Sequence, residues 1–198
     1  MSQTVVFDLF GVIARTQTEE ARRRIEELAG VGGAPFWEAY WDGRPAYDAG
    51  QSSQDYWAAT AGRLGVRLDP RTVEALIEAD LASWTEADER MVELVTELAG
   101  QGRPLGLLSN IIEDLVPVFE GIHGHWLRHF TALTYSCRIG VAKPDPRAYE
   151  ICARRLGVAP ADVIFFDDNE RNVMAAREAG MTAEVFVSPE RVREVLAG

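Results

Sequence analysis

The residues best suited to chemistry follow short apolar runs of the sequence. They are Asp8, the pair Ser109-Asn110, Lys143 and the acidic pair Asp167-Asp168. If the apolar runs are parallel neighbours in one sheet, their polar ends meet at its carboxyl edge, where open α/β sheets bind ligands. A site with carboxylates, a hydroxyl and an ammonium suits an anionic substrate and a divalent cation. The pattern therefore indicates a site for a small anion at one edge of a sheet.

Each of these residues also has an ordinary structural explanation. An Asp at a strand end often forms a turn, a Ser often caps a helix, and a lysine is usually exposed. The pair Asp167-Asp168 is harder to explain, because adjacent carboxylates repel each other unless a cation or a donor compensates. Mg²⁺ is the simplest compensation, since it binds oxygen ligands and keeps several waters. Capping of the next helix by Asp168 or Asn169 is compatible with such a metal site.

The elements that must position these residues alternate between strands and helices. Apolar runs predict strands at 4–7, 105–108, 132–135, 163–166 and 183–187, and helical spacing predicts helices at 86–99, 113–120, 147–156 and 170–179, with a short closing helix. Such alternation implies βαβ units and a parallel sheet. We predict an α/β fold with a Rossmann-like core of five parallel strands, in which 4–7 is central and 163–166 lies beside it.

A segment rich in aromatic residues interrupts this alternation. Residues 18–29 have helical periodicity, and further helices are predicted at 54–64 and at 70–83, where Asp69 provides the N-cap and Pro70 the first helical position. No convincing strand occurs in this segment. We expect residues 1–14 and 86–198 to form the core and residues 15–85 to form an inserted helical cap.

The motifs and their order resemble those of the haloacid dehalogenase superfamily of hydrolases. The matching segments are FDLFGV at 7–12, LLSN at 107–110, KPDPRAY at 143–149 and FFDDNERN at 165–172. The resemblance extends over essentially the entire chain and is closest to the sugar-phosphate phosphatase branch with a small helical cap. It implies that Asp8 is a nucleophile that forms an aspartyl-phosphate and that Lys143 steadies both nucleophile and phosphate. It also implies that Ser109 and Asn110 bind the transferred phosphoryl group.

The same resemblance implies a metal cofactor. Mg²⁺ would be held by Asp8, Asp168 and the backbone carbonyl of Phe10, and Asp167 would help directly or through a water. Phosphoryl transfer needs positioning and neutralisation of the phosphoryl oxygens, which a metal, an ammonium and N–H groups supply. We therefore predict a Mg²⁺-dependent phosphatase that acts on a small phosphorylated metabolite.

One residue departs from the family pattern. Phosphatases of this family usually carry a second Asp two residues after the nucleophile as general acid and base, and here that position is Phe10. Loss of a positioned proton donor slows catalysis by about 10²–10⁴-fold. Three interpretations follow: a slow or selective phosphatase, a 2-haloacid dehalogenase-like hydrolase that needs no metal, or a non-catalytic protein that binds phosphorylated ligands. The acidic pair favours the first, because a metal-free dehalogenase has no use for it.

The cap offers candidates for substrate contact at Trp41, Arg44, Tyr47 and Asp48. Arg44 is predicted to bind the anionic group of the substrate, and the aromatic rings could stack on a sugar. The alternative is that the aromatic residues form the core of the cap itself.

Three histidines, His123, His125 and His129, lie close together. No cysteine or carboxylate accompanies them at the spacing of metal ligands, so we predict no metal site there. Trp126 between them suggests an amphipathic surface helix.

Composition limits the class of protein. The chain has 198 residues, of which 47% are hydrophobic and 26% charged, as in a folded globular protein. Its formal net charge of −11 disfavours nucleic acid as a partner. Neither a signal peptide nor a membrane span is evident, and Cys137 and Cys152 show no metal-ligand spacing. We expect a cytoplasmic monomer or homodimer with buried thiols and no membrane partner.

Overall fold

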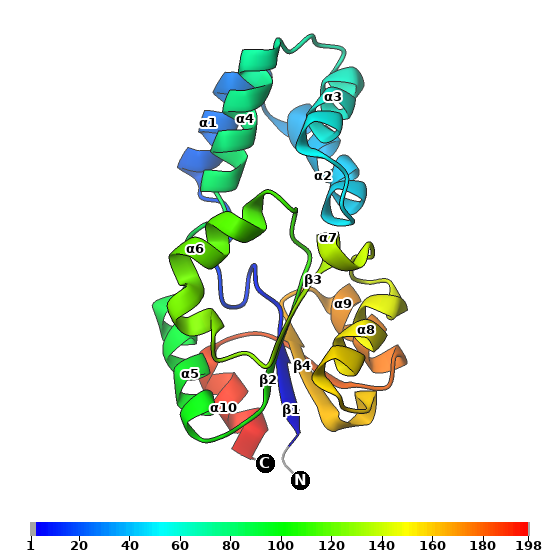
Figure 1. Cartoon of the computed structure of the whole chain (residues 1–198). Coiled ribbons are helices and arrows are strands. Elements are labelled where there is room, and N and C mark those ends of the chain that lie inside the picture. The colour runs from blue at the N-terminus through cyan, green and yellow to red at the C-terminus, as the bar shows by residue number, and fades with distance from the viewer. Residues whose placement is uncertain (1–2, 198) are drawn as a thin grey trace.

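The computed structural model describes residues 3–197 and contains one parallel sheet of five strands in the order β3-β2-β1-β4-β5 (Figure 1). The strands are β1 (Thr4–Phe7), β2 (Leu105–Ser109), β3 (Ala132–Tyr135), β4 (Val163–Asp167) and β5 (Thr182–Val185). The predicted α/β fold is confirmed, with β1 central and β4 beside it.

The register of the central strands sets the position of the polar residues. Phe7 pairs with Leu107 on one side and with Phe166 on the other. The residues that follow these three positions therefore leave the sheet at the same edge, its carboxyl edge. All residues of β1, β2 and β4 are buried, because helices cover both faces of the sheet.

The helices of the core are α5 (Glu89–Gly100), α6 (Leu115–Leu127), α7 (Ser136–Ile139), α8 (Pro146–Leu156), α9 (Glu170–Glu178) and α10 (Pro189–Ala197), with a 3₁₀ turn η1 (Pro160–Asp162). Helices α5, α6 and α10 share a hydrophobic core with Val5 and Phe7. Helices α8 and α9 share a second core with Val6 and Phe165. Alternate residues of the strands thus face opposite helical layers.

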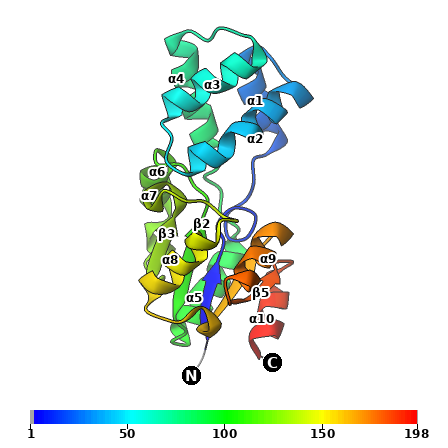
Figure 2. The same cartoon turned by 90° about the vertical axis from the view of Figure 1, so that its right-hand side faces the viewer.

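The other helices are α1 (Glu19–Ala29), α2 (Ala34–Asp48), α3 (Ser53–Leu64) and α4 (Pro70–Ala82). They form a bundle beyond the carboxyl edge, in which α1 lies along α4 and α2 along α3 (Figures 1 and 2). The predicted N-cap is present, since Asp69 accepts hydrogen bonds from the backbone N–H groups of Arg71 and Thr72. The buried interior of the helical bundle is largely aromatic and includes Phe36, Trp37, Tyr40, Tyr47, Tyr56 and Trp57.

Two chain crossings connect this bundle to the core, and they lie side by side. The backbone N–H of Arg15 donates to the carbonyl of Glu86 at 2.8 Å, and that of Asp88 donates to the carbonyl of Ile13 at 2.8 Å. We therefore keep residues 15 and 85 as the proposed boundaries of the cap. Residues 1, 2 and 198, which the proposed core includes, lie outside the described residues.

Several sequence predictions needed correction. The helix predicted at 113–120 is α6, which extends to Leu127, because Phe119, His123 and Trp126 are buried on one side of it. Burial of this face outweighs the low helix propensity of the glycines within it. Trp126 is therefore a core residue rather than part of a surface helix.

Two smaller differences concern strand and thiol positions. The last strand, predicted at 183–187, is β5 at 182–185, and beyond it Val187 is 73% exposed. Cys152 is buried as expected, whereas Cys137 is only half-buried. Among the described residues, none of the helices has the length and apolar character required to cross a membrane.

Candidate active site

Lys143 bridges two carboxylates at the carboxyl edge. Its Nζ lies 2.7 Å from Oδ1 of Asp8 and 2.6 Å from Oδ2 of Asp167. All three side chains are buried, and Asp8 also accepts a hydrogen bond from the backbone N–H of Leu9 at 2.6 Å. The sheet thus brings together residues that are separated by more than a hundred positions in the sequence.

Lys143 is the only lysine among the 20 basic residues of the chain, and the other 19 are arginines. An ammonium is a compact charge with three donors, whereas a guanidinium is a planar fork. Only the compact group fits between two buried carboxylates at such short distances. Asn110 fixes the backbone of Lys143, since its side chain accepts from the Lys143 N–H at 2.8 Å and donates to the Lys143 carbonyl at 2.9 Å.

Asp168 completes a group of three carboxylates with Asp8 and Asp167, whose nearest oxygens lie within 4.8 Å of one another. Its carboxylate lies against Gly11, where a Cβ atom would be only 2.2 Å from Asp168 Oδ2. Gly11 also has a φ of +86°, which favours glycine. The loop after β1 therefore needs glycine at this position so that Asp168 can approach it.

The side chains at this edge carry an excess of negative charge, which favours binding of a cation. Three carboxylates and one ammonium carry a formal charge of −2. Both oxygens of Asp167 already accept hydrogen bonds, from Lys143, Asn172 and the backbone of Asn169. Asp168, by contrast, is exposed. The residues therefore fit a divalent cation on the side of Asp8 and Asp168, with Asp167 holding Lys143 instead of binding the metal directly.

Burial and neighbouring charges shift the pKa values of these groups. Burial raises the pKa of Asp8 well above its ordinary value, although the charge of Lys143 lowers it. Partial burial and the charge of Asp167 raise the pKa of Asp168. Burial alone would lower the pKa of Lys143, but Asp8 and Asp167 outweigh that effect and raise it. A divalent cation beside Asp8 would favour the ionised carboxylate that a nucleophile requires.

Ser109 ends β2 at the same edge. Its hydroxyl is fully buried and has no hydrogen-bond partner within the described residues. A buried hydroxyl without a partner is unfavourable, so it points to a ligand that would supply an acceptor. The side chain of Asn110 forms two hydrogen bonds with the backbone of Lys143, and the binding of the phosphoryl group by Asn110 stays a prediction.

Phe10 packs among aromatic side chains. The ring packs edge-on against Trp84 at 5.1 Å and against Phe119 at 5.9 Å. It therefore joins the end of the cap to helix α6 of the core. The loop position that the family usually gives to a carboxylate serves here in hydrophobic packing.

Arg44 lies in the cap and is paired with carboxylates there. It is 3.2 Å from Asp48 and 3.6 Å from Asp80, and it donates to the hydroxyl of Tyr40 at 3.1 Å. Burial would lower the pKa of Arg44, but Tyr40, Asp48 and Asp80 raise it. With one guanidinium and two carboxylates, the cluster has no spare positive charge. Binding of a substrate anion by Arg44 thus stays a prediction that its pairing does not favour.

The other cap candidates differ in accessibility. Tyr47 is buried and Asp48 is 9% exposed, whereas Trp41 is 48% exposed. Of the three histidines, His123 is buried and its Nε2 contacts the carbonyl of Thr85 at 2.8 Å, whereas His125 is exposed. His123 therefore ties helix α6 to the crossing between core and cap.

Sequence reasoning missed one supporting residue, Asn172. Its side chain donates to both oxygens of Asp167, at 3.0 and 3.1 Å, and so fixes the carboxylate that holds Lys143. Its position one turn after Asn169, the observed N-cap of α9, was the available signal.

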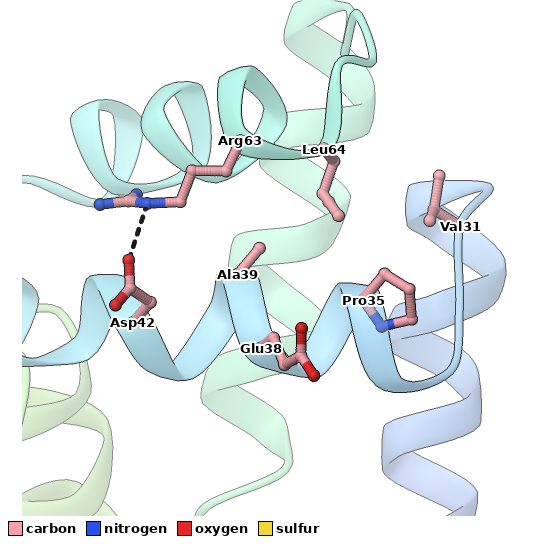
Figure 3. A pocket seen from close by; sticks show the side chains of 7 residues that line it. All are labelled: Val31, Pro35, Glu38, Ala39, Asp42, Arg63 and Leu64. Carbon is pink, nitrogen blue, oxygen red and sulfur yellow. Dashed lines mark ion pairs between the residues drawn. The ribbon is translucent and has the colours of Figure 1, made fainter.

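A large cavity of the cap lies elsewhere. It has a volume of about 710 Å³, and its lining residues all come from the cap: Val31, Pro35, Glu38, Ala39, Asp42, Arg63 and Leu64 (Figure 3). Its polar contact is an ion pair between Arg63 and Asp42. None of the residues around Asp8 contributes to it, so we assign it no part in the chemistry.

Known proteins are similar to this chain in sequence and in fold. The family described as haloacid dehalogenase-like hydrolase matches residues 3–180. A phosphatase of Mycobacterium tuberculosis (strain CDC 1551 / Oshkosh) is 31% identical over 186 residues, which cover 90% of this chain and 84% of the relative.

Two solved structures have the same fold. A wild-type HAD family enzyme of Bacteroides thetaiotaomicron, in complex with magnesium and inorganic phosphate, gives a TM-score of 0.66 at 16% identity over 93% of this chain and 94% of its own. The L-2-haloacid dehalogenase of Xanthobacter autotrophicus, with chloropropionic acid covalently bound, gives a TM-score of 0.72 at 23% identity. The match covers 100% of this chain and 84% of the dehalogenase chain. Because the family match spans most of the sequence and the carboxyl edge carries the expected side chains, this chain belongs to the haloacid dehalogenase-like hydrolases.

Proposed function

We propose that this protein is a Mg²⁺-dependent phosphatase that hydrolyses a small phosphorylated metabolite through an aspartyl-phosphate on Asp8. The observation that carries the proposal is the group of three carboxylates around Lys143, with a formal charge of −2, beside the unpartnered hydroxyl of Ser109. A divalent cation and a phosphoryl group would satisfy both features. The phosphatase of Mycobacterium tuberculosis among the relatives supports the same reaction.

Each residue has a defined part in this reaction. Asp8 attacks phosphorus with its carboxylate, and Lys143 offsets the charge of both nucleophile and phosphoryl oxygens. Asp167 and Asn172 hold Lys143 in place. The Ser109 hydroxyl donates to a phosphoryl oxygen. Water then hydrolyses the acyl phosphate and regenerates Asp8.

The metal would be held by Asp8, Asp168 and the carbonyl of Phe10. Mg²⁺ supplies neutralisation of the developing charge on the phosphoryl oxygens. The Bacteroides enzyme of the same fold, which contains magnesium and inorganic phosphate, supports this cofactor.

The surroundings of Asp8 favour a small substrate. Asp8 is 7% exposed and Lys143 is 5% exposed, because the cap lies over the carboxyl edge. A macromolecule could reach them only after a large displacement of the cap. Action in the cytoplasm as a monomer or homodimer stays an expectation from the sequence.

A second candidate is a dehalogenase-like hydrolase. Phe10 favours it, since attack of an Asp on a carbon–halogen bond requires no proton donor for the leaving halide. The dehalogenase of Xanthobacter autotrophicus has the same fold. The exposed Asp168, whose approach to Gly11 is built into the loop, favours the phosphatase because a metal-free reaction leaves it without a role.

One experiment separates these reactions. Purified protein is incubated with a panel of phosphate monoesters, with Mg²⁺ or with excess EDTA, and inorganic phosphate is measured; halide release from 2-chloropropionate is measured in parallel. We expect phosphate release with Mg²⁺ only, and none from Asp8→Asn. Halide release without phosphate release would establish the second candidate, and saturable binding of phosphate esters without turnover would indicate a non-catalytic protein.

A further inference from the structure

A phosphatase of this kind must protonate the leaving oxygen of its substrate. At the loop position where a carboxyl group would do so, Phe10 is engaged with Trp84 and Phe119. Asp167 cannot replace it, because its two oxygens accept hydrogen bonds from Lys143 and Asn172. The proton must therefore come from elsewhere, and the cap is the element that lies above the site.

One end of helix α2 is docked on the carboxyl edge. The hydroxyl of Tyr47 donates to Ser53 Oγ at 2.8 Å, and Ser53 in turn donates to Asp114 of the core. Gly50 lies so close to the core that a Cβ atom there would be 3.1 Å from the carbonyl oxygen of Cys137. The chain from 47 to 50 thus rests on the segments that follow β2 and β3, the strands that lead to Ser109 and Tyr135.

Asp48 lies between these two contacts and is only 9% exposed. Its placement over the active-site edge follows from the docking of the 47–50 segment on Asp114 and Cys137. Burial raises the pKa of Asp48, as expected for a carboxyl group that must carry a proton.

Among the described residues, the one charged partner of Asp48 is Arg44. Oδ1 of Asp48 lies 3.2 Å from Arg44 as an ion pair, without the geometry of a hydrogen bond. Asp80, the other carboxylate beside Arg44, is fully buried and accepts hydrogen bonds from Tyr40 at 2.6 Å and from Trp84 at 3.3 Å. Asp80 is therefore held inside the cap by neutral donors as well as by Arg44, whereas Asp48 is paired, within the described part of the chain, with Arg44 alone.

We propose that Asp48, carried into the site by the cap, is the general acid and base of the reaction at Asp8, and that Arg44 is its positioning residue. This inference rests on the proposed phosphatase function. In the first half of the reaction Asp8 forms a bond to phosphorus, the bond from phosphorus to the leaving oxygen breaks, and that oxygen takes the proton of Asp48. In the second half Asp48 takes a proton from the attacking water, the water oxygen forms a bond to phosphorus, and the bond between phosphorus and Asp8 breaks, so that inorganic phosphate leaves and the Asp8 carboxylate is regenerated.

The arrangement places nucleophile and proton donor on different parts of the chain. The nucleophile Asp8 and the proton donor Asp48 act together only while the 47–50 segment contacts the core. The cap would thereby supply a catalytic group in addition to covering the substrate. Phe10 can then serve in packing without loss of the acid.

The test compares two phosphate esters with different needs for an acid. Glycerol 2-phosphate has a poor leaving group, whereas p-nitrophenyl phosphate has one that departs without a proton. With Mg²⁺, Asp48→Asn should lower kcat/KM for glycerol 2-phosphate by about 10²–10⁴-fold and for p-nitrophenyl phosphate by less than about tenfold. Because water activation is also lost, acid-quenched Asp48→Asn should retain phosphate on the protein under steady turnover of p-nitrophenyl phosphate.

The matched control is Asp42→Asn, an exposed aspartate of the same helix that pairs with Arg63. This variant should have the same kcat/KM as wild type for both esters. If Asp48→Asn folds poorly, Asp48→Ala with added formate provides the second measurement, since a small acid should restore glycerol 2-phosphate hydrolysis. An equal loss for both esters, without retained phosphate and without rescue, would overturn the role of Asp48. Wild-type protein that hydrolyses neither ester would instead overturn the proposed function.

Discussion

Replacement of Lys143 by Met should reveal how strongly the active site depends on its ammonium. The change keeps most of the side-chain volume but leaves Asp8 and Asp167, which lie 2.7 and 2.6 Å from Nζ, without their shared cation. Removing one partner of a buried ion pair destabilises a protein by about 3–5 kcal/mol. At about 2–4 °C per kcal/mol for a protein of this size, the melting temperature should fall by roughly 6–20 °C.

The loss should depend on pH. Without Lys143, only the hydrogen bond from the backbone N–H of Leu9 offsets the burial that raises the pKa of Asp8. Folded Asp8 then binds a proton more tightly than unfolded Asp8, so the free energy of unfolding decreases as pH rises from about 3.9 through the raised folded pKa. The free energy of unfolding of Lys143→Met should therefore be closer to that of wild type at pH 5 than at pH 8. Mg²⁺ should restore more stability to the variant than to wild type, because the variant site has a charge of −3.

Urea unfolding followed by tryptophan fluorescence at both pH values, with and without Mg²⁺, measures these effects. Arg147→Met is the control, since Arg147 pairs with Asp145 at the surface and its side chain is 70% exposed. It should change the free energy of unfolding by less than about 1 kcal/mol. Lys143→Arg should lack phosphatase activity because a guanidinium does not fit between the carboxylates. A loss below about 1 kcal/mol in Lys143→Met at pH 8, or a loss independent of pH, would refute the reasoning.

Four further predictions follow from other contacts. Gly11→Ala should displace Asp168, which would lie 2.2 Å from the new Cβ, and Mg²⁺ should no longer raise the melting temperature of this variant. Ser53→Ala breaks the link from Tyr47 to the core and should raise KM several-fold while destabilising the protein by about 1 kcal/mol, as measured by kinetics and urea unfolding. Asp69→Ala removes the N-cap of α4, whose hydrogen bonds lower the pKa of Asp69. The stabilisation by the cap is therefore complete above the unfolded pKa of about 3.9 and is lost as pH falls through the lower folded pKa. In urea titrations the free energies of unfolding of variant and wild type should differ at about pH 7 and converge near pH 2. EDTA should abolish phosphate release, and Mg²⁺ at 100 times its Kd should add about 2.7 kcal/mol of stability in the same unfolding assay.

Much of the core was predictable because its signals are local. Asp8 follows a buried apolar strand, Ser109 and Asp167 end two others, and the alternation of strands and helices predicts a parallel sheet. Parallel pairing brings the ends of neighbouring strands to one edge whatever the details of packing. The bounds of β1 and the N-cap at Asp69 were predicted correctly for the same reason, since each depends on a few adjacent residues.

The cap was less predictable because its important contacts join different helices. Arg44 suggested an anion-binding group, yet Asp48 on the same helix and Asp80 on α4 neutralise it. Helix α6 extends past its glycines because Trp126 is buried in the core. The Arg44–Asp48 pair is an i,i+4 contact, but neither the pairing of Arg44 with Asp80 nor the burial of Trp126 is encoded in the residues immediately around these positions.

The groups at the carboxyl edge, their position at the ends of strands and the replacement of a carboxylate by Phe10 were all evident from the sequence. How those groups are used depends on the tertiary structure. It placed Lys143 between two carboxylates, packed Phe10 against Trp84 and Phe119, and brought Asp48 on α2 over the core. The physical reason is that residue type and strand periodicity are local properties, whereas burial and ion pairing depend on which distant side chains share the same small volume.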